Sequence, residues 1–283
     1  GMIDLHTHST FSDGSLTPEA LVEEAARIGL RALALTDHDG VAGVPRFLAA
    51  CARAGIRGVA GVEISVDCPS GTQHMLGYFV DTHHAELQAT LARLRTAREE
   101  RNRAILEKLH RLGYPLTWEE VAALAGEEVV GRPHFAQALE ARGAVRSREE
   151  AFERLLAKGR PAYAERYRLS PAESIRLIRA AGGVPVLAHP SSLDLPPAAL
   201  RAMVEQLAAQ GLQGIEVYYP EHAAQQEREY LELARTFGLV ATGGSDFHGA
   251  FNPQVRLGVG FGNLRVPDEL LANLEARRPA AQR

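Results

Sequence analysis

Short apolar segments alternate with amphipathic helical stretches along most of this 283-residue chain, and most apolar segments end in polar residues. Helical spacing is found at 18–30, 43–55, 171–182, 197–211 and 221–238; several of these stretches open with Pro and close on Gly, as helices do. Alternation of strand and helix predicts a parallel sheet in an α/β fold, and polar strand ends favour closure into a barrel. The predicted strands cover residues 2–5, 31–35, 57–60, 73–80, 184–188, 214–217 and 239–242.

The stretch from 82 to 168 breaks this alternation. It is rich in Arg, Glu, Ala and Leu, and it has helical character with no evident strand. We therefore predict a barrel-like domain formed by 2–81 and 169–270, with 82–168 inserted as a helical subdomain. Its position in the chain suggests a cap over the substrate, and a purely stabilising subdomain is an equally good interpretation.

Composition excludes several classes of partner. The net charge of -4 and the pI near 6.3 give no basic field for long DNA, so any nucleotide must be held locally. The two cysteines, Cys51 and Cys68, are too few for a disulfide framework and predict a reducing cytoplasm. No apolar run approaches the roughly 18 to 20 residues of a membrane span, and no signal peptide is evident. The sequence does not predict an oligomeric state.

Seven histidines and five carboxylates gather in clusters, mostly at predicted strand ends. Imidazole nitrogens and carboxylate oxygens bind Zn, Mn or Fe without thiolate ligands. Because parallel strands in a barrel end at one face, these dispersed residues can converge there. The sequence therefore indicates a multinuclear metal hydrolase. The residues are His6, His8, Asp13, Asp37, His38, Asp39, Glu63, His74, His134, His189, Asp246 and His248.

The individual signals differ in strength. His6 and His8 alternate along a strand, so both imidazoles project to the same side. Glu63 follows an apolar strand, where a carboxylate is costly unless it is paired or coordinated. Asp13 precedes a glycine and is equally typical of a turn. Taken singly, His74, His134 and His189 are each at least as well explained as hydrogen-bonded structural histidines.

Two further clusters follow predicted strands. His38 is the predicted ligand of the first, and Asp37 or Asp39 would hold a metal-bound imidazole through its second nitrogen. A turn or helix cap would explain one of these carboxylates but not the histidine. Asp246 and His248 form a second alternating pair, after glycines that permit a close backbone approach. The histidines predicted to lie at the surface, outside the site, are His83, His84, His110 and His222.

The order of these motifs resembles the polymerase and histidinol phosphatase (PHP) family of metal-dependent phosphoesterases. The motifs are HTHS with SDG, TDHD, GVE, a lone His, GRPH, AHP and GSDFH. The similarity runs from Met2 to about Gly262 and looks most like the nucleoside 3',5'-bisphosphate phosphatase and short-RNA 5'-to-3' exoribonuclease subgroup. It implies a distorted (β/α)7 barrel, TIM-like, with three divalent metal ions, commonly Mn, Fe or Zn.

Carried over position by position, the resemblance implies three ligand sets, with Glu63 as a bridge. No ligand of the pattern is missing, which argues against a non-catalytic metal-binding or nucleotide-binding module. The first implied set is His6, His8, Glu63 and Asp246; the second is Asp13, His38 and His248; the third is Glu63, His74 and His134.

The expected reaction is hydrolysis of the 3'-phosphate of a nucleoside 3',5'-bisphosphate to a nucleoside 5'-monophosphate and phosphate. Metal ions lower the pKa of bound water from near 16 to about 7, so a metal-bridging hydroxide is the expected nucleophile. His189 is left over once the sets are filled, and we expect it to bind the phosphoryl group or protonate the leaving oxygen. Arg132 is predicted to hold phosphate oxygens, with a surface ion pair as its alternative.

Other reactions fit the same ligands. Stepwise 5'-to-3' exonuclease action on short 5'-phosphorylated RNA requires only that the cap leave room for a chain. Histidinol-phosphate phosphatase is a sister activity. Amidohydrolase chemistry is disfavoured because no lysine stands at a strand end, where a carbamylated bridging ligand would be expected.

Overall fold

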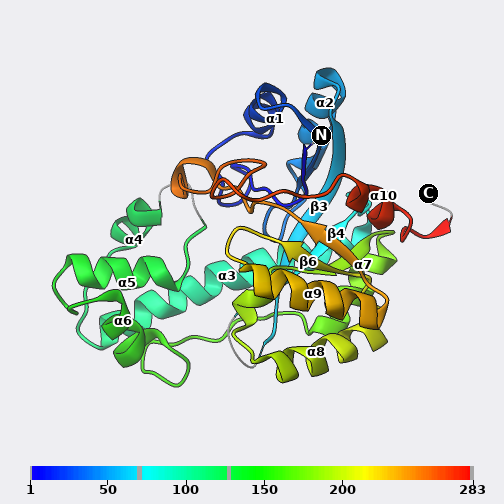
Figure 1. The fold of residues 1–283 in the computed structure, drawn as a ribbon. Coiled ribbons are helices and arrows are strands. Elements are labelled where there is room, and N and C mark those ends of the chain that lie inside the picture. The colour runs from blue at the N-terminus through cyan, green and yellow to red at the C-terminus, as the bar shows by residue number, and fades with distance from the viewer. Residues whose placement is uncertain (1, 69–71, 126–128, 281–283) are drawn as a thin grey trace. The chain divides into compact units, whose positions relative to one another are not determined.

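The computed structural model describes residues 2–68, 72–125 and 129–280 (Figure 1). The chain divides into two compact units, one formed by residues up to Leu91 together with those from Arg168 onward, the other by Ala92–Tyr167. The first boundary differs from the predicted residue 82 because helix α3 (Ala85–Arg111) begins in the first unit and continues into the second. None of the helices in the described ranges has the length and hydropathy of a membrane span.

Seven strands form one sheet in the first unit and follow each other in chain order. All the predicted strands are present, with ends shifted by a few residues. The strands are β1 (Met2–Asp4), β2 (Leu30–Leu35), β3 (Arg57–Val66), β4 (Gln73–Tyr78), β5 (Val184–Leu187), β6 (Gly214–Tyr218) and β7 (Val240–Gly243).

The sheet departs from the predicted parallel pattern at one strand. β4 pairs antiparallel with both β3 and β5, whereas the other neighbouring strands pair in parallel. The physical reason is the short connection between β3 and β4, since a parallel pair needs a crossover of a dozen or more residues. The β3–β4 pairing sets Glu63 opposite Leu76 and Ser65 opposite His74.

The first and last strands approach each other where they end. Among the described residues they form no regular ladder, but the Leu5 N–H donates to the Gly243 carbonyl at 3.2 Å, and Thr7 forms a bridge with Phe247. This irregular contact gives the sheet the character of a distorted, incompletely closed barrel. It also brings the segment after β1 beside the segment after β7.

Helices cover the sheet of the first unit. α2 packs on α1 and β3, α7 on β4 and β5, and α9 on β6 and β7. Several boundaries follow from local chemistry: the Thr17 side chain accepts the Ala20 N–H at 3.1 Å, and Gly55 adopts a left-handed conformation after α2. The helices are α1 (Pro18–Arg27), α2 (Val44–Ala54), α7 (Pro171–Ala180), α8 (Pro197–Ala209), α9 (Ala224–Phe237) and α10 (Glu269–Glu275).

One hydrophobic core of this unit consists of side chains from the sheet and the final helix. Leu5, Leu76, Tyr78 and Val186 are all fully buried in it. The Tyr78 hydroxyl donates to the Leu5 carbonyl at 2.5 Å, which satisfies a polar group in this apolar environment. The core supports the strand ends at which the candidate ligands lie.

The second unit is helical in the part of the chain that the structure describes. Its core includes Ile105, Leu109, Phe135 and Leu139, all fully buried. Besides the C-terminal part of α3, it contains α4 (Trp118–Ala125), α5 (Arg132–Ala141), α6 (Arg148–Ala151) and a π-helical turn (Phe152–Leu156).

Candidate metal centre

The candidate ligands of the first unit converge from five strands of the sheet. Those after β1 and β7 meet because the segments after these two strands approach each other, with an isolated bridge between Thr7 and Phe247. The Asp39 N–H, in the segment after β2, donates to the Glu63 carbonyl at 3.0 Å. The Ala188 N–H donates to the His74 carbonyl at 3.1 Å and so brings the end of β5 to β4. Glu63 lies in β3 and His74 in β4, whereas the other ligands follow strands: His6 and His8 follow β1, His38 follows β2, and Asp246 and His248 follow β7.

A first group consists of His6, His8, Glu63 and Asp246. His6 Nε2 lies 3.1 Å from Glu63 Oε1 and 3.2 Å from Asp246 Oδ1. His8 Nε2 lies 3.1 Å and 2.8 Å from the same two oxygens. Four donor atoms therefore face one another in a space from which both histidines exclude solvent, each being 0% exposed.

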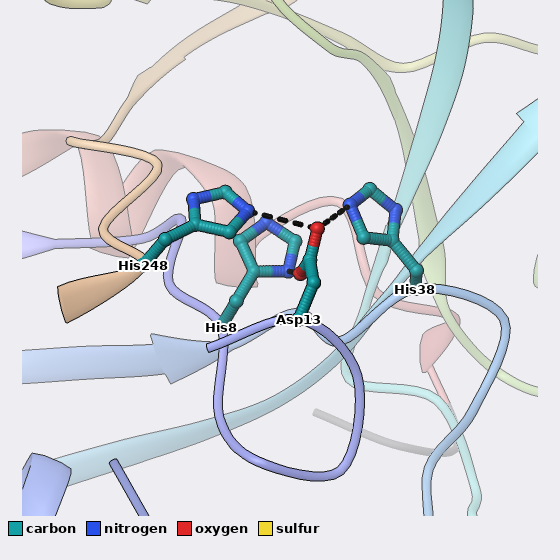
Figure 2. A group of neighbouring side chains, drawn as sticks. All are labelled: His8, Asp13, His38 and His248. Carbon is teal, nitrogen blue, oxygen red and sulfur yellow. Dashed lines mark ion pairs between the residues drawn. The ribbon is translucent and has the colours of Figure 1, made fainter. Parts of the chain in front are cut away.

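A second group surrounds Asp13 (Figure 2). Asp13 Oδ2 lies 3.2 Å from His248 Nε2 and 3.4 Å from His38 Nε2, and Asp13 Oδ1 lies 3.5 Å from His8 Nδ1. Figure 2 shows the three imidazoles arranged around this carboxylate. His8 therefore contacts both groups, one through each ring nitrogen.

A third group lies on the other side of Glu63. His74 Nδ1 is 2.9 Å from Glu63 Oε2, and His38 belongs to the same group. His189 Nε2 is 3.1 Å from this oxygen and 3.3 Å from His74 Nδ1. The structure thus places His189 beside Glu63 and His74, the two residues with which the resemblance groups His134.

The two predicted residues of the GRPH motif belong to the second unit. His134 lies in the first turn of α5, where its Nδ1 accepts the Gly131 N–H at 2.9 Å. The Arg132 guanidinium donates to the Leu156 carbonyl at 3.2 Å and lies over the Tyr163 ring, 5.5 Å from its centre. The three groups described above lie in the first unit, so the functional roles of Arg132 and His134 stay predictions.

Opposite charges stabilise each other within the metal-free cluster. Burial opposes protonation of His6, but neighbouring carboxylates, Asp246 foremost, outweigh it and raise the pKa of His6 well above its ordinary 6.5. Burial likewise opposes ionisation of Glu63, but adjacent histidines, His6 foremost, hold the pKa of Glu63 well below its ordinary 4.5. Opposite charges therefore stabilise part of the metal-free cluster, whereas burial lowers the pKa of His74 below its ordinary 6.5.

The residues of the cluster fit divalent metal ions. Both ring nitrogens of His8 and Oδ1 of Asp246 are buried without a hydrogen-bond partner, although the two residues approach to 2.8 Å. Such atoms are costly to bury unless a partner satisfies them. A bound cation would supply that partner, and a set of imidazoles and carboxylates without thiolate suits Mn, Fe or Zn.

Sequence reasoning missed two residues that contact the ligands. Glu216 of β6 lies 2.8 Å from His6 Nδ1 and accepts the His189 N–H at 2.8 Å. The Tyr219 hydroxyl donates to Asp246 Oδ2 at 2.7 Å. Glu216 carries the same signal as Glu63, a carboxylate on an apolar strand, and could have been found in the same way.

The structure bears on two expectations about other polar residues. Of the two carboxylates considered as partners of an imidazole, Asp37 accepts the Ser9 N–H at 2.7 Å and the hydroxyls of Ser9 and Ser12 at 2.8 and 2.7 Å, and the role of Asp39 stays a prediction. Asp37 thereby holds the loop that carries Asp13. His222 is not at the surface but 7% exposed, with its Nδ1 2.7 Å from the Val217 carbonyl.

The backbone at the site is constrained. Asp246 has φ 59°, in the left-handed region that non-glycine residues rarely adopt, and its N–H donates to the His6 carbonyl at 2.8 Å. A Cβ at Gly244 would lie 2.5 Å from the backbone nitrogen of His6. Gly244 therefore allows two strand ends to approach each other closely, and not a ligand to approach the backbone.

Comparisons with known proteins agree with this site. A family profile described as PHP domain matches residues 4–169. A curated 3',5'-nucleoside bisphosphate phosphatase of Chromobacterium violaceum is 36% identical over 247 residues, 87% of each chain. The 5'-3' exoribonuclease Rnm of Salmonella typhimurium is 34% identical over 247 residues, 87% of this chain and 84% of the relative.

Solved structures show the same relationship over the whole chain. A Chromobacterium violaceum protein described as an amidohydrolase, solved with bound sulfate and no metal, has a TM-score of 0.81 at 33% identity, with 100% of both chains covered. A Bifidobacterium adolescentis protein, provisionally described as a metal-dependent phosphoesterase, has a TM-score of 0.78 at 31% identity, with 99% and 98% covered. With more than half of its length matched by the family profile, the chain belongs to the PHP domain family.

Proposed function

We propose that the protein hydrolyses the 3'-phosphate of nucleoside 3',5'-bisphosphates, such as adenosine 3',5'-bisphosphate, to phosphate and a nucleoside 5'-monophosphate. The observation that carries this proposal is the convergence of three overlapping groups of nitrogen and oxygen donors around the buried carboxylate of Glu63. The Chromobacterium violaceum relative named for this activity supports the class of substrate.

The three groups would hold three divalent ions, with Mn as our proposed metal. Bound ions of this kind lower the pKa of water to about 7 and neutralise phosphate oxygens. The first ion would be held by His6, His8, Glu63 and Asp246, and the second by Asp13, His38 and His248, whose group also contains His8. The third would be held by Glu63 and His74, whose group also contains His38, together with His189, which lies beside both.

The assignment of His189 to the third set rests on its tautomer. The Ser192 hydroxyl donates its hydrogen to the Thr72 carbonyl at 2.8 Å, so it can only accept from His189 Nδ1, which lies 2.7 Å away. In the neutral ring, Nδ1 therefore carries the proton and Nε2 has the free lone pair. His189 Nε2 lies 3.1 Å from Glu63 Oε2, where the third group needs a metal ligand.

This assignment replaces the expected role of His189 as a phosphate-binding residue or acid, because Nε2, the nitrogen with the free lone pair, would be a metal ligand. In the proposed reaction water adds to phosphorus, the bond to the 3'-oxygen breaks, and the leaving oxygen takes up a proton. No side chain has to act as the nucleophile. The histidines and carboxylates of the three groups would hold the ions that supply this chemistry.

A second candidate function has specific support. The exoribonuclease Rnm of Salmonella typhimurium is nearly as similar as the phosphatase, at 34% against 36% identity over 247 residues in each case. Stepwise hydrolysis of short 5'-phosphorylated RNA uses the same reaction at phosphorus. The amidohydrolase description of a structural neighbour finds less support here, because neither lysine of the chain, Lys108 or Lys158, stands at the end of a strand, where a carbamylated bridging ligand would be expected.

A side-by-side assay tests the proposal. Purified protein with Mn is given adenosine 3',5'-bisphosphate, histidinol phosphate or a 5'-phosphorylated RNA oligomer, and phosphate and nucleotide products are quantified. We expect fastest release from the bisphosphate, loss of release after chelation, and loss in His8→Ala. His83→Ala, which alters an exposed histidine, is the control and should retain the rate. Undiminished release after removal of all divalent ions would exclude the proposed chemistry.

A further inference from the structure

Strand β6 carries a carboxylate in an environment without solvent. Glu216 is 0% exposed and is flanked along the strand by Ile215 and Val217, which are also fully buried. A buried charge is expensive unless hydrogen bonds satisfy it. Both oxygens of Glu216 are satisfied: Oε2 lies 2.8 Å from His6 Nδ1, and Oε1 accepts the His189 N–H at 2.8 Å.

The first of these contacts fixes the tautomer of His6. An ionised carboxylate offers only acceptors, so the hydrogen between Glu216 and His6 belongs to Nδ1 of the imidazole. In the neutral ring, the free lone pair is then on Nε2. That atom lies 3.1 Å from Glu63 Oε1 and 3.2 Å from Asp246 Oδ1, in the first group of donors.

The second contact holds an unusual backbone conformation. His189 has φ 20° and ψ 73°, outside the common regions for a residue with a Cβ. Such a conformation persists only where the surroundings over-determine it. Glu216 accepts the His189 N–H, and the Ser192 hydroxyl oxygen lies 2.7 Å from His189 Nδ1. The other ring nitrogen, Nε2, therefore points toward the third group.

We propose that Glu216 is a positioning residue that joins the first and third groups of metal ligands through its two oxygens. It touches neither substrate nor the reacting atoms. Its carboxylate orients one ligand of each group, so a single change should weaken both ion sites together. The inference rests on the proposed function only in taking these groups as metal sites. Outer partners of this kind typically contribute about 10- to 100-fold to metal affinity.

Glu216→Gln tests the proposal with little change of shape. The amide has one acceptor oxygen, and its NH2 group must face a hydrogen on either His6 or His189. We expect Mn affinity, measured by calorimetric titration of the metal-free protein, to fall about 10- to 100-fold at two sites while the third is retained. Metal content after gel filtration gives an independent readout. A lower melting temperature of the metal-free variant with unchanged Mn affinity and stoichiometry would show a merely structural role and overturn the proposal.

Asp37→Asn is the matched comparison, because it removes the charge of another buried carboxylate that contacts neither His6 nor His189. We expect it to spare the two sites that Glu216→Gln weakens. Equal weakening of those sites in both variants would mean a general effect of charge and would overturn the proposal.

A measurement on the unaltered protein keeps the proposal testable if Glu216→Gln does not fold. In the Zn-loaded protein, proton–nitrogen correlation spectra of the imidazoles should show His6 protonated at Nδ1 and not at Nε2. The opposite tautomer would overturn the proposal. If the unaltered protein binds Mn yet hydrolyses no bisphosphate, the proposed substrate is wrong, and the metal titrations still decide the role of Glu216.

Discussion

The two carboxylate oxygens of Glu63 contact two different pairs of histidines. Oε1 lies 3.1 Å from both His6 Nε2 and His8 Nε2, and Oε2 lies 2.9 Å from His74 Nδ1 and 3.1 Å from His189 Nε2. At 1% exposure, burial opposes ionisation of this carboxyl, but the adjacent histidines, His6 foremost, outweigh it and hold the pKa of Glu63 well below 4.5. An acceptor of this kind can bridge two cations, so the loss of Glu63 would disable two ion sites at once.

His189→Ala and His134→Ala together distinguish the two candidates for the third ligand set. We expect His189→Ala to bind one ion fewer than the unaltered protein, because it removes the nitrogen nearest to Glu63 Oε2 after His74. His134→Ala should keep every ion. Metal content per protein after gel filtration in limiting Mn is the measurement. Full metal content in His189→Ala, or loss of an ion in His134→Ala, would reverse the assignment.

Tyr219→Phe tests the support given to Asp246. The change removes only the hydroxyl that donates to Asp246 Oδ2 at 2.7 Å, and it keeps the ring beside His189. We expect turnover of the Mn-loaded enzyme to fall roughly tenfold or more, because an outer hydrogen bond that orients a ligand is lost. Tyr218→Phe, at the neighbouring position, serves as the control and should keep the rate. Equal rates in the two variants would remove this role from Tyr219.

At the residue scale, sequence reasoning succeeded where local geometry decides the outcome. His6 and His8 share one face because strand side chains alternate, and both do lie in the first group. The choice between His134 and His189 has no such local basis, since both stand next to a proline. It depends on which segment the fold brings beside His74, and His189 follows the strand that pairs with β4.

At the scale of elements, β4 is the instructive case. Its apolar composition predicted a strand, and a strand is present, but its direction depends on the connection before it. Only residues 67–72 separate β3 from β4, too few for a crossover helix, so the two strands pair antiparallel. The predicted strands, 57–60 and 73–80, left twelve residues between them, enough for a crossover; the reversal follows only because β3 continues to Val66.

The first turn of α7 offers a stability test that leaves the site untouched. The Ser170 side chain accepts the Glu173 N–H at 3.1 Å, and its hydroxyl donates to Glu173 Oε1 at 3.0 Å. We expect Ser170→Ala to lower the free energy of unfolding by about 1 kcal/mol, because a helix cap is lost. Chemical denaturation measures the effect, and metal content should not change. Ser170→Thr, which keeps the capping oxygen, should lie close to the unaltered protein; equal losses in both variants would point to packing instead.

At the scale of the whole molecule, the site depends on contacts between the two ends of the sheet. His6 and Asp246 are 240 positions apart, yet the Asp246 N–H donates to the His6 carbonyl at 2.8 Å. The alternation of strands and helices predicted that strand ends would share a face, but it contains no information on which residues pair across the incomplete closure. That pairing depends on Gly244, whose missing side chain lets β7 approach the backbone of His6.

The cluster also links the stability of the whole molecule to pH. Carboxylates near His8, Asp13 foremost, outweigh its burial and raise the pKa of His8 well above 6.5, as they do for His6. Histidines near Asp13, His38 foremost, outweigh its burial and hold the pKa of Asp13 well below 3.8. The raised histidine pKa values stabilise the fold below about pH 6.5, and this contribution is lost as the pH rises through the folded-state values. The lowered carboxylate pKa values stabilise the fold above about pH 4, and that contribution is lost on further acidification.

Metal-free and metal-loaded protein should therefore respond to pH in opposite directions. We expect the melting temperature of chelator-treated protein to fall between about pH 6.5 and pH 9, as histidines held protonated by the carboxylates lose their protons. Over the same interval the Mn-loaded protein should become more stable, since metal binding requires deprotonated imidazoles and releases their protons. Thermal melts of both forms across this range, with proton release followed by calorimetry in buffers of different ionisation enthalpy, measure the effect. A metal-free melting temperature that rises with pH over this interval would contradict the charge balance inferred for the cluster.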